Sequence, residues 1–400
     1  MSDIDRFKPE DRRGVDTLYR RTHGPDAAEA NRLRWDWQHR RNPYNSAGQP
    51  GIWVAREGPT VIGHYPTLPV RISLKGLEVE GAWGTDAMVA PERERQGLGE
   101  ALLRAWDRHS GAVLTLGASV ESRQLTERLH WPATHVLPCL VKPLTRRAVR
   151  LPNLPTLVNR LLSIAMAPVI QIVSRSRPLR AECEPIRRFD ASFTALWERL
   201  APKFDLAVRR DAAYLNWRYV EPPHVRYSVV ALKRNGETHG YAVYRHRHEP
   251  LGRVTMLVDL LADPDDLSGV KTLLRWVDRA ARAEDSDKVR CYVMNAALRR
   301  VLRKNGYFVV KSTLEVGVKV NAVQVPQGFY DDTNRWHMLT GNQDQLHWVI
   351  GTSFLPVETN NPFNSMPGNF AGTDRIAVVD RHGNLRAFFD GLRVETPSAV

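Results

Sequence analysis

Cysteine is scarce in this chain of 400 residues. Cys139, Cys183 and Cys291 are odd in number, far apart, and not part of any Cys-x-x-Cys pair. A small secreted scaffold held by disulfides needs an even set of cysteines. The composition therefore excludes a disulfide framework and favours a reducing compartment, so we expect a cytoplasmic protein.

Long apolar runs are also missing. Residues 1–6 contain no apolar signal region, which argues against secretion. The most apolar stretch, residues 154–173, is interrupted by Pro155, Arg160 and Pro168, so it does not predict a membrane-spanning helix. It predicts an amphipathic linker helix that lies on the protein. The alternative is a weak peripheral contact with an anionic bilayer.

Positive charge, by contrast, is abundant. Lys and Arg total 57 against 44 Asp and Glu, a net charge of +13, and residues 141–190 alone carry ten basic and three acidic side chains. Such an excess favours acidic partners: the phosphates of coenzyme A, an anionic membrane surface, or a nucleic acid. Nucleic acid is not expected, because the basic stretch lacks interleaved aromatic side chains on which bases could stack.

The most informative stretch is residues 88–103. It reads as the end of an apolar strand, a break at Pro91, a basic loop containing Gly97 and Gly99, and an apolar helix. Glycines leave backbone N–H groups accessible, and a helix N-terminus adds partial positive charge. No Gly-x-Gly-x-x-Gly fingerprint is present, and no Lys-Ser or Lys-Thr follows the glycines, so dinucleotide and nucleoside-triphosphate loops are excluded. The pattern predicts a pyrophosphate cradle of another kind.

This stretch resembles the coenzyme A loop of the GNAT N-acyltransferases. The Val-x-Pro lead-in at residues 89–91 and the run at residues 95–103 match that loop, which the family writes Gln/Arg-x-x-Gly-x-Gly/Ala; here Glu94 holds the first position. The resemblance implies an acetyl group transferred from acetyl-CoA to an unidentified amine by direct attack, without a metal. It implies these cofactor-binding positions: Met88, Val89, Ala90, Arg95, Gln96, Gly97, Leu98, Gly99, Glu100, Ser119 and Ser122.

A faint internal repeat runs through the chain with a spacing of about 180 residues. The segment around Trp37, with the hairpin-like residues 53–65 behind it, has a counterpart around Trp217 and residues 229–241. This order is similar to that of the tandem GNAT proteins. At the position of the first basic loop the second unit carries three aspartates, within residues 263–266, which would repel a pyrophosphate. We therefore expect the second unit to bind no coenzyme A.

The predicted fold class is α/β (α+β), with two tandem GNAT-like mixed-sheet domains and a short C-terminal β-hairpin. The expected divisions are an acyl-CoA-binding domain at residues 1–145, a basic amphipathic linker at 146–184, a degenerate second domain at 185–335, and an extension at 336–400. Within that extension, residues 336–341 and 377–391 resemble the closing segment of SCO-type, thioredoxin-like copper-delivery proteins. The Cys pair that those proteins need is absent, and Gly372 holds the place of their histidine, so no metal site is expected.

Three side chains are candidates for the general base. Asp86 precedes Met88 by two residues, and on a continuous strand both would share one face beside the thioester. Glu80 and His64, on adjacent expected strands, are the other candidates. The aromatic residues of the first unit either line an acceptor pocket or form its core, and the core reading is favoured; they are Trp35, Trp37, Tyr44, Trp53, Tyr65 and Trp83.

The tyrosine with which the family commonly protonates the leaving thiolate has no counterpart here. The equivalent positions hold Thr126 and Leu302. Two functions thus stay open at the level of sequence. One is an N-acetyltransferase in which solvent or another hydroxyl supplies the proton, and the other is a non-catalytic acyl-CoA-binding or scaffold protein.

Overall fold

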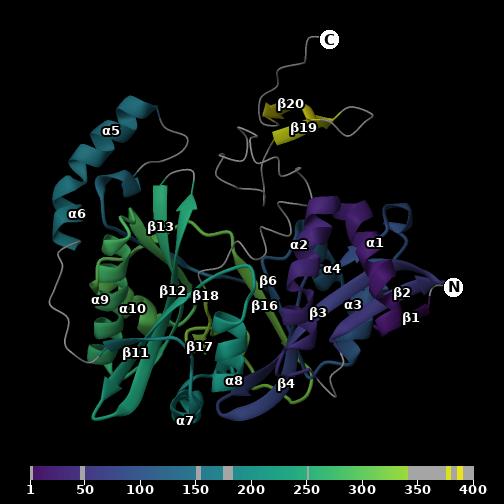
Figure 1. The fold of residues 1–400 in the computed structure, drawn as a ribbon, viewed down its shortest axis with the longest axis horizontal. Helices are drawn as coiled ribbons and strands as arrows, with labels where there is room; N and C mark the ends of the chain where they lie inside the picture. Colours follow the sequence, from purple (N-terminus) through teal and green to yellow (C-terminus); the bar gives the residue numbers. More distant parts are fainter. Residues whose placement is uncertain are drawn as a thin grey trace.

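The computed structural model describes residues 3–45, 50–149, 155–173, 183–249 and 252–340, together with two strands near the C-terminus. These residues form two mixed sheets flanked by helices, one on each side of Figure 1. The predicted α/β class with two mixed sheets is confirmed.

The first sheet is built mainly from the N-terminal part of the chain. Its path runs β1-β2-β3-β4-β6-β16-β7, and β5, β10 and β17 join it off this path. The strand bounds are β1 (Asp3–Arg6), β2 (Ile52–Glu57), β3 (Thr60–Leu74), β4 (Leu77–Gly84), β5 (Met88–Val89), β6 (Ala112–Leu116), β7 (His135–Val136), β10 (Leu206–Val208), β16 (Glu315–Val320) and β17 (Trp336–His337). The accompanying helical segments are η1 (Pro9–Asp11), α1 (Arg12–His23), α2 (Pro25–Trp35), η2 (Asp36–Arg40), η4 (Pro91–Arg93), α3 (Leu98–Arg108) and α4 (Val120–Arg128).

The second sheet follows the path β15-β8-β14-β13-β12-β11-β9, with β18 paired to β14. Its strands are β8 (Cys139–Pro143), β9 (Cys183–Ile186), β11 (Ser228–Arg234), β12 (Glu237–Glu249), β13 (Gly252–Ala262), β14 (Lys288–Val293), β15 (Phe308–Val310) and β18 (Leu339–Thr340). The helical segments of this half are η5 (Arg146–Val149), α5 (Thr156–Ala165), α6 (Ala167–Val173), α7 (Ala191–Leu200), η6 (Ala201–Lys203), α8 (Ala212–Leu215), η7 (Asn216–Val220), α9 (Leu267–Ala283) and α10 (Ala296–Lys304).

Tight turns set the register of the long hairpins. Lys75 and Gly76 join β3 to β4, and Asn235 and Gly236 join β11 to β12; all four residues have positive φ. Two consecutive positive φ values are the geometry of a type I′ turn, whose twist matches that of the flanking strands. The predicted hairpin around residues 235 and 236 is therefore confirmed.

The two sheets exchange strands. β8 comes from the N-terminal half of the chain but pairs antiparallel with β14 and β15 in the second sheet. Conversely, β16 comes from the C-terminal half and pairs antiparallel with β6 and β7 in the first sheet. Figure 1 shows β6 and β16 side by side at the centre of the molecule. Neither sheet is complete without a strand from the other half of the chain.

The two segments that the sequence repeat aligned face each other. η2 and η7 are both short π-helical turns, and the rings of Trp37 and Trp217 stack at 5.2 Å between their centroids. The indole Nε1 of Trp37 donates to the carbonyl oxygen of Trp217 at 2.6 Å, and the indole of Trp217 donates to the carbonyl of Trp37 at 2.7 Å. The two hydrogen bonds are thus reciprocal.

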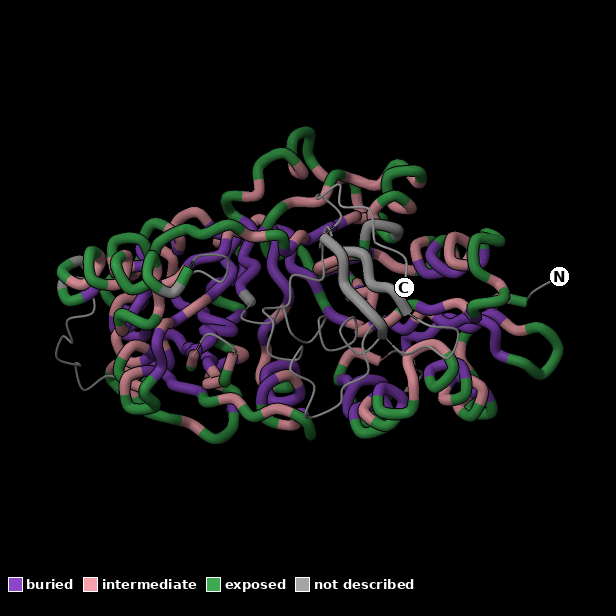
Figure 2. The backbone as a smooth tube through the Cα atoms, turned by 90° about the horizontal axis from the view of Figure 1, so that it is seen from above, coloured by how far each residue is buried: buried purple, intermediate pink, exposed green. Residues whose placement is uncertain are grey.

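One hydrophobic core spans both sheets. It joins strand residues of the first sheet, such as Ile72 and Leu114, to those of the second, such as Val243 and Met256. Buried positions run through the middle of both halves in Figure 2. Trp336 is completely buried in this core, so the first residues of the segment expected as an extension belong to the main body.

The C-terminal hairpin is present. β19 (Arg375–Val379) pairs antiparallel with β20 (Leu385–Asp390), as the sequence predicted. The expected turn at residues 382–384 lies outside the described residues. Among the helices that the structure does describe, none is long and apolar enough to cross a membrane.

Candidate active site

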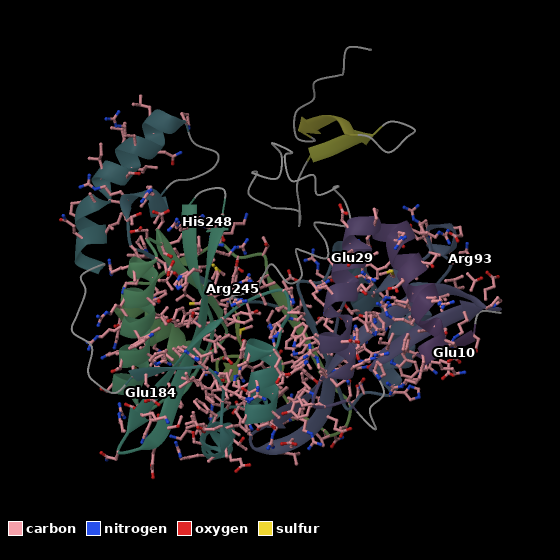
Figure 3. All side chains as sticks on the ribbon, in the orientation of Figure 1. Glu10, Glu29, Arg93, Glu184, Arg245 and His248 are labelled. Carbon is pink, nitrogen blue, oxygen red and sulfur yellow. The ribbon has the colours of Figure 1, made fainter. Side chains whose placement is uncertain are left out.

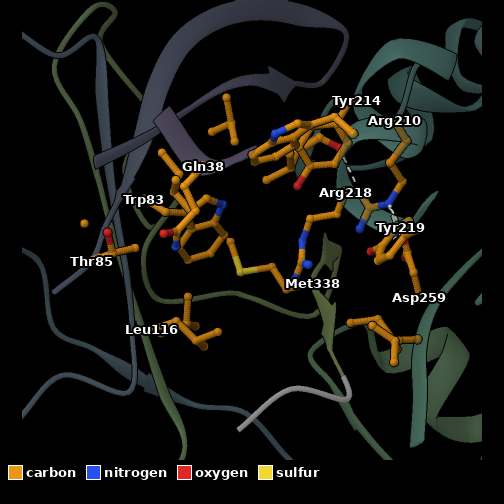
Figure 4. A pocket seen from close by; sticks show the side chains of 18 of the residues that line it. Gln38, Trp83, Thr85, Leu116, Arg210, Tyr214, Arg218, Tyr219, Asp259 and Met338 are labelled. Atoms are coloured by element: carbon orange, nitrogen blue, oxygen red, sulfur yellow. Dashed lines mark hydrogen bonds and ion pairs between the residues drawn. The ribbon is translucent and has the colours of Figure 1, made fainter. Parts of the chain in front are cut away.

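A cavity of about 180 Å³ lies between the two sheets. One wall is formed by the first sheet and includes Trp83, Thr85 and Leu116, while the opposite wall includes Arg218 and Tyr219 of η7 (Figure 4). Met338, just after β17, lies between these walls. Both halves of the chain thus contribute polar as well as apolar side chains to the cavity lining.

The first sheet opens at this cavity. β4 pairs with the parallel β6 only at Ala82 and Trp83. The chain then leaves β4, and Met88 and Val89 of β5 pair with β3 instead. Within the described residues β5 has no pairing with β6, so a gap separates them on the side where β4 and β6 end.

Asp86 lies in the break between β4 and β5. Its φ of 43° interrupts the strand, so the expectation that Asp86 and Met88 share a face by strand alternation is wrong. The left-handed conformation nevertheless leaves Asp86 in the cavity wall. Burial raises the pKa of its carboxyl group, while the Arg34 cation and the Tyr19 hydroxyl act in the opposite direction. A carboxylate with a raised pKa takes up a proton more readily than an ordinary aspartate does, and its place beside a cavity would bring it near a bound substrate.

The two other base candidates lie elsewhere. Glu80 is exposed on β4, 4.0 Å from the guanidinium of Arg71, and does not line the cavity. His64 belongs to β3 and its side chain is fully buried. Desolvation, with smaller contributions from His23 and Arg12, lowers its pKa to about 3. An imidazole held neutral in the core and away from the cavity is a packing residue. The structure therefore brings only Asp86 of the three candidates to this cavity.

The glycine-containing loop has the features of an anion cradle. Gly97 has a φ of 80° and is the N-cap of α3, with no side chain capping the helix. Within the described part of the chain, no hydrogen bond engages the backbone N–H groups of residues 95–100. A Cβ placed on Gly97 would meet nothing within 4 Å, and one on Gly99 only a Val89 methyl at 3.9 Å. The N–H groups are open to a ligand.

Ion pairs anchor the start of this loop. Both carboxylate oxygens of Glu92 accept from the guanidinium of Arg21 at 2.9 Å, and Arg93 donates to Glu57 at 2.5 Å. Leu98, the first residue of α3, is buried in the N-terminal core. Arg93 lies at the outer edge of the molecule in Figure 3, whereas Arg245 of β12 lies toward its middle. The cradle is thus fixed at both ends and open between them.

The other positions that the resemblance implies for coenzyme A binding lie on β5, just after it, and at the start of α4. Met88 and Ala90 are buried, and the Ala90 N–H is used by the Ile62 carbonyl, so Ala90 contributes no donor. Ser119 and Ser122 are exposed and bond each other at the N-terminus of α4, where the Ser119 Oγ accepts from the Ser122 N–H at 3.2 Å. They follow β6, so they lie on the side where β4 and β6 end.

Most of the aromatic candidates are core residues, as expected. Trp35 and Trp53 are buried in the N-terminal core, and Tyr65 packs against Trp106 with centroids 5.0 Å apart. Tyr44 donates its hydroxyl proton to Asp211 at 2.7 Å. Trp37 and Trp83 have both roles. Trp37 is buried in the core and Trp83 packs against it, and both side chains also line the cavity.

Sequence reasoning missed the polar wall of the cavity. Asp259 of β13 is almost completely buried and accepts hydrogen bonds from Arg210 Nε at 3.1 Å and from the hydroxyls of Tyr219 and Tyr241 at 3.1 and 3.0 Å. The one available signal was a lone aspartate within the apolar strand at residues 254–262. Nothing local indicated that Arg210, almost 50 residues away, would be its partner.

The aspartates that replace the basic loop in the second half form hydrogen bonds and ion pairs with neighbouring residues. Asp266 caps α9 by accepting from the Gly269 N–H at 2.9 Å, and it also pairs with Arg234 at 2.6 Å. Lys203 contacts Asp263 and Asp265 at 2.6 and 2.9 Å. This junction is closed by its own ion pairs, unlike the loop before α3. In the described residues no group of three His, Cys, Asp or Glu side chains is arranged to hold a metal.

Comparison with known proteins agrees with this geometry. Residues 4–112 match the family model described as an acetyltransferase (GNAT) domain, and no curated protein matches the chain. A GCN5-related N-acetyltransferase from Anabaena variabilis ATCC 29413 has a similar structure, with a TM-score of 0.52 and 12% identity over 80% of this chain and 73% of that one.

Two further solved structures have the same fold. An N-myristoyltransferase of Saccharomyces cerevisiae with bound myristoyl-CoA gives a TM-score of 0.51 at 11% identity, over 79% of this chain and 82% of that one. A conserved protein of unknown function from Enterococcus faecalis V583, described as a probable N-acyltransferase, gives 0.53 at 9% identity, over 79% and 72%. Such low identities show the fold alone. Residues 4–112 therefore match a GNAT acetyltransferase domain, and the chain as a whole shares the fold of these solved structures.

Proposed function

We propose that this protein is an N-acyltransferase that transfers an acetyl group from acetyl-CoA to an amine by direct attack. The observation that carries the proposal is the cavity at the gap between β5 and β6, with Asp86 in its wall. The donor approaches from the GNAT domain and the acceptor occupies the cavity. The proposal extends to a tandem arrangement, in which the second half supplies the far wall, because the Trp37 and Trp217 contacts are reciprocal.

The loop before α3 fits the pyrophosphate of the donor. The open N–H groups of residues 95–100 supply hydrogen bonds, and the α3 N-terminus supplies partial positive charge. The exposed Arg95 adds a full cation. Glu94 is exposed too, so its side chain can turn away into solvent and need not oppose the phosphates.

Asp86 is the proposed base. It removes a proton from the acceptor ammonium, directly or through a water, and the amine nitrogen then forms a bond to the thioester carbon. The carbonyl oxygen gains negative charge, which backbone N–H groups at the β5 edge would stabilise. The nitrogen then loses its second proton to solvent, and collapse of the intermediate breaks the C–S bond to give the amide; the departing thiolate takes a proton from solvent or a hydroxyl group. No covalent acyl-cysteine step is proposed, since Cys139 and Cys291 are buried in the cores and Cys183 lies on β9, the edge strand of the second sheet.

A charge at Gly99 tests the donor site without damaging the helix. Gly99→Asp places a carboxylate in the first turn of α3. There its negative charge interacts favourably with the helix dipole, which stabilises the helix, but it repels a pyrophosphate. We expect micromolar binding of acetyl-CoA by calorimetry in the wild type, weakened at least tenfold in Gly99→Asp, with an unchanged or higher melting temperature.

Two control variants accompany this titration. Gly99→Ala adds only a methyl group that meets Val89 at 3.9 Å, so its affinity is expected to stay within a few-fold of the wild type. Glu94→Gln restores the family's residue and is expected to bind at least as tightly. Equal affinity of all four proteins, or no binding to any of them, contradicts the proposed donor site.

The second candidate function is a non-catalytic acyl-CoA-binding or scaffold protein. It is favoured by Thr126, a residue of α4 that stands where the family commonly has its acidic tyrosine and whose hydroxyl already bonds the Arg123 carbonyl at 2.9 Å. Binding of acetyl-CoA without thiol release in the presence of any amine would favour this candidate. Thiol release that depends on an amine would exclude it.

A further inference from the structure

The cavity lining contains more positive than negative charge. Its charged residues are the cations Arg34, Arg210 and Arg218 and the anions Asp86 and Asp259. Arg210 and Asp259 form a buried pair and cancel each other. Arg34 acts on Asp86 and favours its charged form. The lining as a set therefore holds one more cation than anion.

His224 indicates the sign of the local electric field. It lies at the rim of the cavity, with its ring 5.3 Å from that of Trp37. Partial desolvation lowers the pKa of His224 to about 4, and the three charges that also lower it are Arg34, Arg218 and Arg245. The pKa of Arg245 is itself lowered, first by burial and then by Arg218. All these charges oppose a further cation, so the potential here is positive and favours an anion.

Arg218 is placed to meet that anion. In Figure 4 its side chain extends from η7 into the middle of the cavity, toward Met338. Its guanidinium lies 5.4 Å from the centre of the Tyr219 ring, which holds it in a defined orientation. A planar guanidinium presents two parallel N–H donors that match the two oxygens of a carboxylate.

Gln38 supplies a second group that points to a ligand. It is one of the buried residues lining the same cavity, and among the residues that the structure describes its Oε1 has no hydrogen-bond partner. A buried amide oxygen without a donor is costly unless something binds to it. An amine N–H of a bound acceptor would satisfy it, on the side of the cavity that Trp83 and Thr85 also line (Figure 4).

We propose that the amine acceptor carries a carboxylate, which Arg218 binds while the amine lies toward Gln38 and Asp86. This inference rests on the proposed acyl transfer and names the class of its acceptor: amino acids, or molecules that end in an amino-acid carboxylate. The acceptor's negative charge would neutralise the excess cation of the lining.

The test uses a pair of product analogues that differ only in charge. N-acetylglycine and N-acetylglycinamide are titrated into the full chain, because products bind whether or not the protein turns over. We expect the carboxylate to bind at least tenfold more tightly than the carboxamide, with an affinity that falls as salt is raised. Arg218→Gln is expected to remove this preference, and Arg218→Lys to retain part of it.

Arg32→Gln is the matched control, because Arg32 is an exposed arginine whose ion pair with Glu29 lies on α2, away from the cavity. Equal binding of the two analogues to the wild type overturns the inference, as does a preference that survives in Arg218→Gln. Acetyl-CoA is titrated into the same preparations. Donor binding without a carboxylate preference rejects only the acceptor class, whereas absent donor binding rejects the proposed function. The wild-type comparison stands even if Arg218→Gln fails to fold.

A separate observation concerns α5, which lies at the outer side of the second half, beyond α9 (Figure 1). Leu157, Leu161 and Ile164 are 69%, 59% and 55% exposed. Their spacing of four and then three residues places them on one helix face. Three large apolar side chains on one face of a short helix form an exposed patch of the kind that marks an interaction site.

The sequence on either side of α5 is basic, which favours an anionic partner. Residues 141–181 contain eight Lys or Arg and no Asp or Glu. Of those that the structure describes, Arg146 and Arg147 in η5 and Arg160 in α5 are exposed, and Arg147 contacts Asp287 at 3.1 Å. A ten-residue helix is too short to span a bilayer, and an apolar face flanked by arginines is typical of helices that lie in the interface of an anionic membrane.

We infer that α5 binds the surface of an anionic bilayer through its apolar face, independently of acyl transfer. The full chain is floated with vesicles of phosphatidylcholine alone or with added phosphatidylglycerol. We expect binding to the anionic vesicles, several-fold weaker in high salt and on pure phosphatidylcholine. Replacing Leu157, Leu161 and Ile164 together by Gln keeps good helix formers and should reduce binding at least tenfold.

The control is Leu33→Gln, since Leu33 is a similarly exposed leucine on α2. Vesicle binding that is absent in the wild type, or equal in the triple variant, overturns the inference. So does self-association of the wild type without vesicles that the triple variant lacks, because the patch would then belong to a contact between two copies of the chain.

Discussion

Asp86→Asn is expected to lower kcat/KM for acetyl transfer by about 10²- to 10⁴-fold, the usual contribution of a positioned base. The amide keeps the size and the position of the carboxyl group but cannot take up the ammonium proton. Acetyl-CoA affinity should stay unchanged, since the donor cradle lies in residues 95–100. Steady-state kinetics and calorimetry on the same preparation separate these two effects.

The pH dependence gives a second measure of the same residue. A base works only when deprotonated, so the wild-type rate should fall as the pH drops through the pKa of Asp86. Because burial raises that pKa, the acidic limb should lie above the ordinary aspartate value of 3.8. The limb should vanish in Asp86→Asn.

Stability distinguishes a catalytic from a structural role for Asp86. A carboxyl group whose folded-state pKa is raised is less stable when ionised in the folded protein than in water, so removing its charge should maintain or increase the melting temperature at neutral pH. Glu80→Gln, on an exposed side chain of β4, should leave the rate unchanged. If Asp86→Asn kept the wild-type rate, or if its loss of rate were explained by unfolding, Asp86 would not be the general base.

Asp259→Ala is expected to reduce the free energy of unfolding by about 3–5 kcal/mol. The substitution leaves the buried Arg210 guanidinium without its counter-ion and deprives the Tyr219 and Tyr241 hydroxyls of their acceptor. Urea denaturation followed by tryptophan fluorescence measures the change, because Trp217 is part of the same core cluster as both tyrosines.

The comparison variants isolate the buried charge. Glu80→Gln breaks an exposed pair with Arg71 at 4.0 Å and should cost less than about 1 kcal/mol. Replacing Arg210 by Met and Asp259 by Leu together should recover much of the stability lost in Asp259→Ala, because no unpaired charge then remains. A loss below about 1 kcal/mol in Asp259→Ala would mean that water reaches Arg210 and that the pair is not buried as described.

The proposed donor loop could be predicted from the sequence because its elements are contiguous. A strand end, a proline, two glycines and an apolar helix within residues 88–103 specify a local structure, and the structure has α3 beginning at Leu98 after a left-handed Gly97. The sequence also aligned the segments around Trp37 and Trp217, and the structure brings these two rings into contact. Asp86 was found for the wrong reason: strand alternation failed at a left-handed residue that no sequence pattern signalled.

The sequence by itself determined the α/β class, the hairpins and the glycine-containing loop that leads into α3, because each depends on side-chain pattern and turn chemistry within some 15 residues. The tertiary structure alone decided that β8 and β16 exchange sheets and that Asp259, Arg210 and Arg218 face Asp86 across one cavity. A strand's sequence specifies that it must bury one face but not against which edge. Partners so far apart in the chain are selected only when the whole core packs.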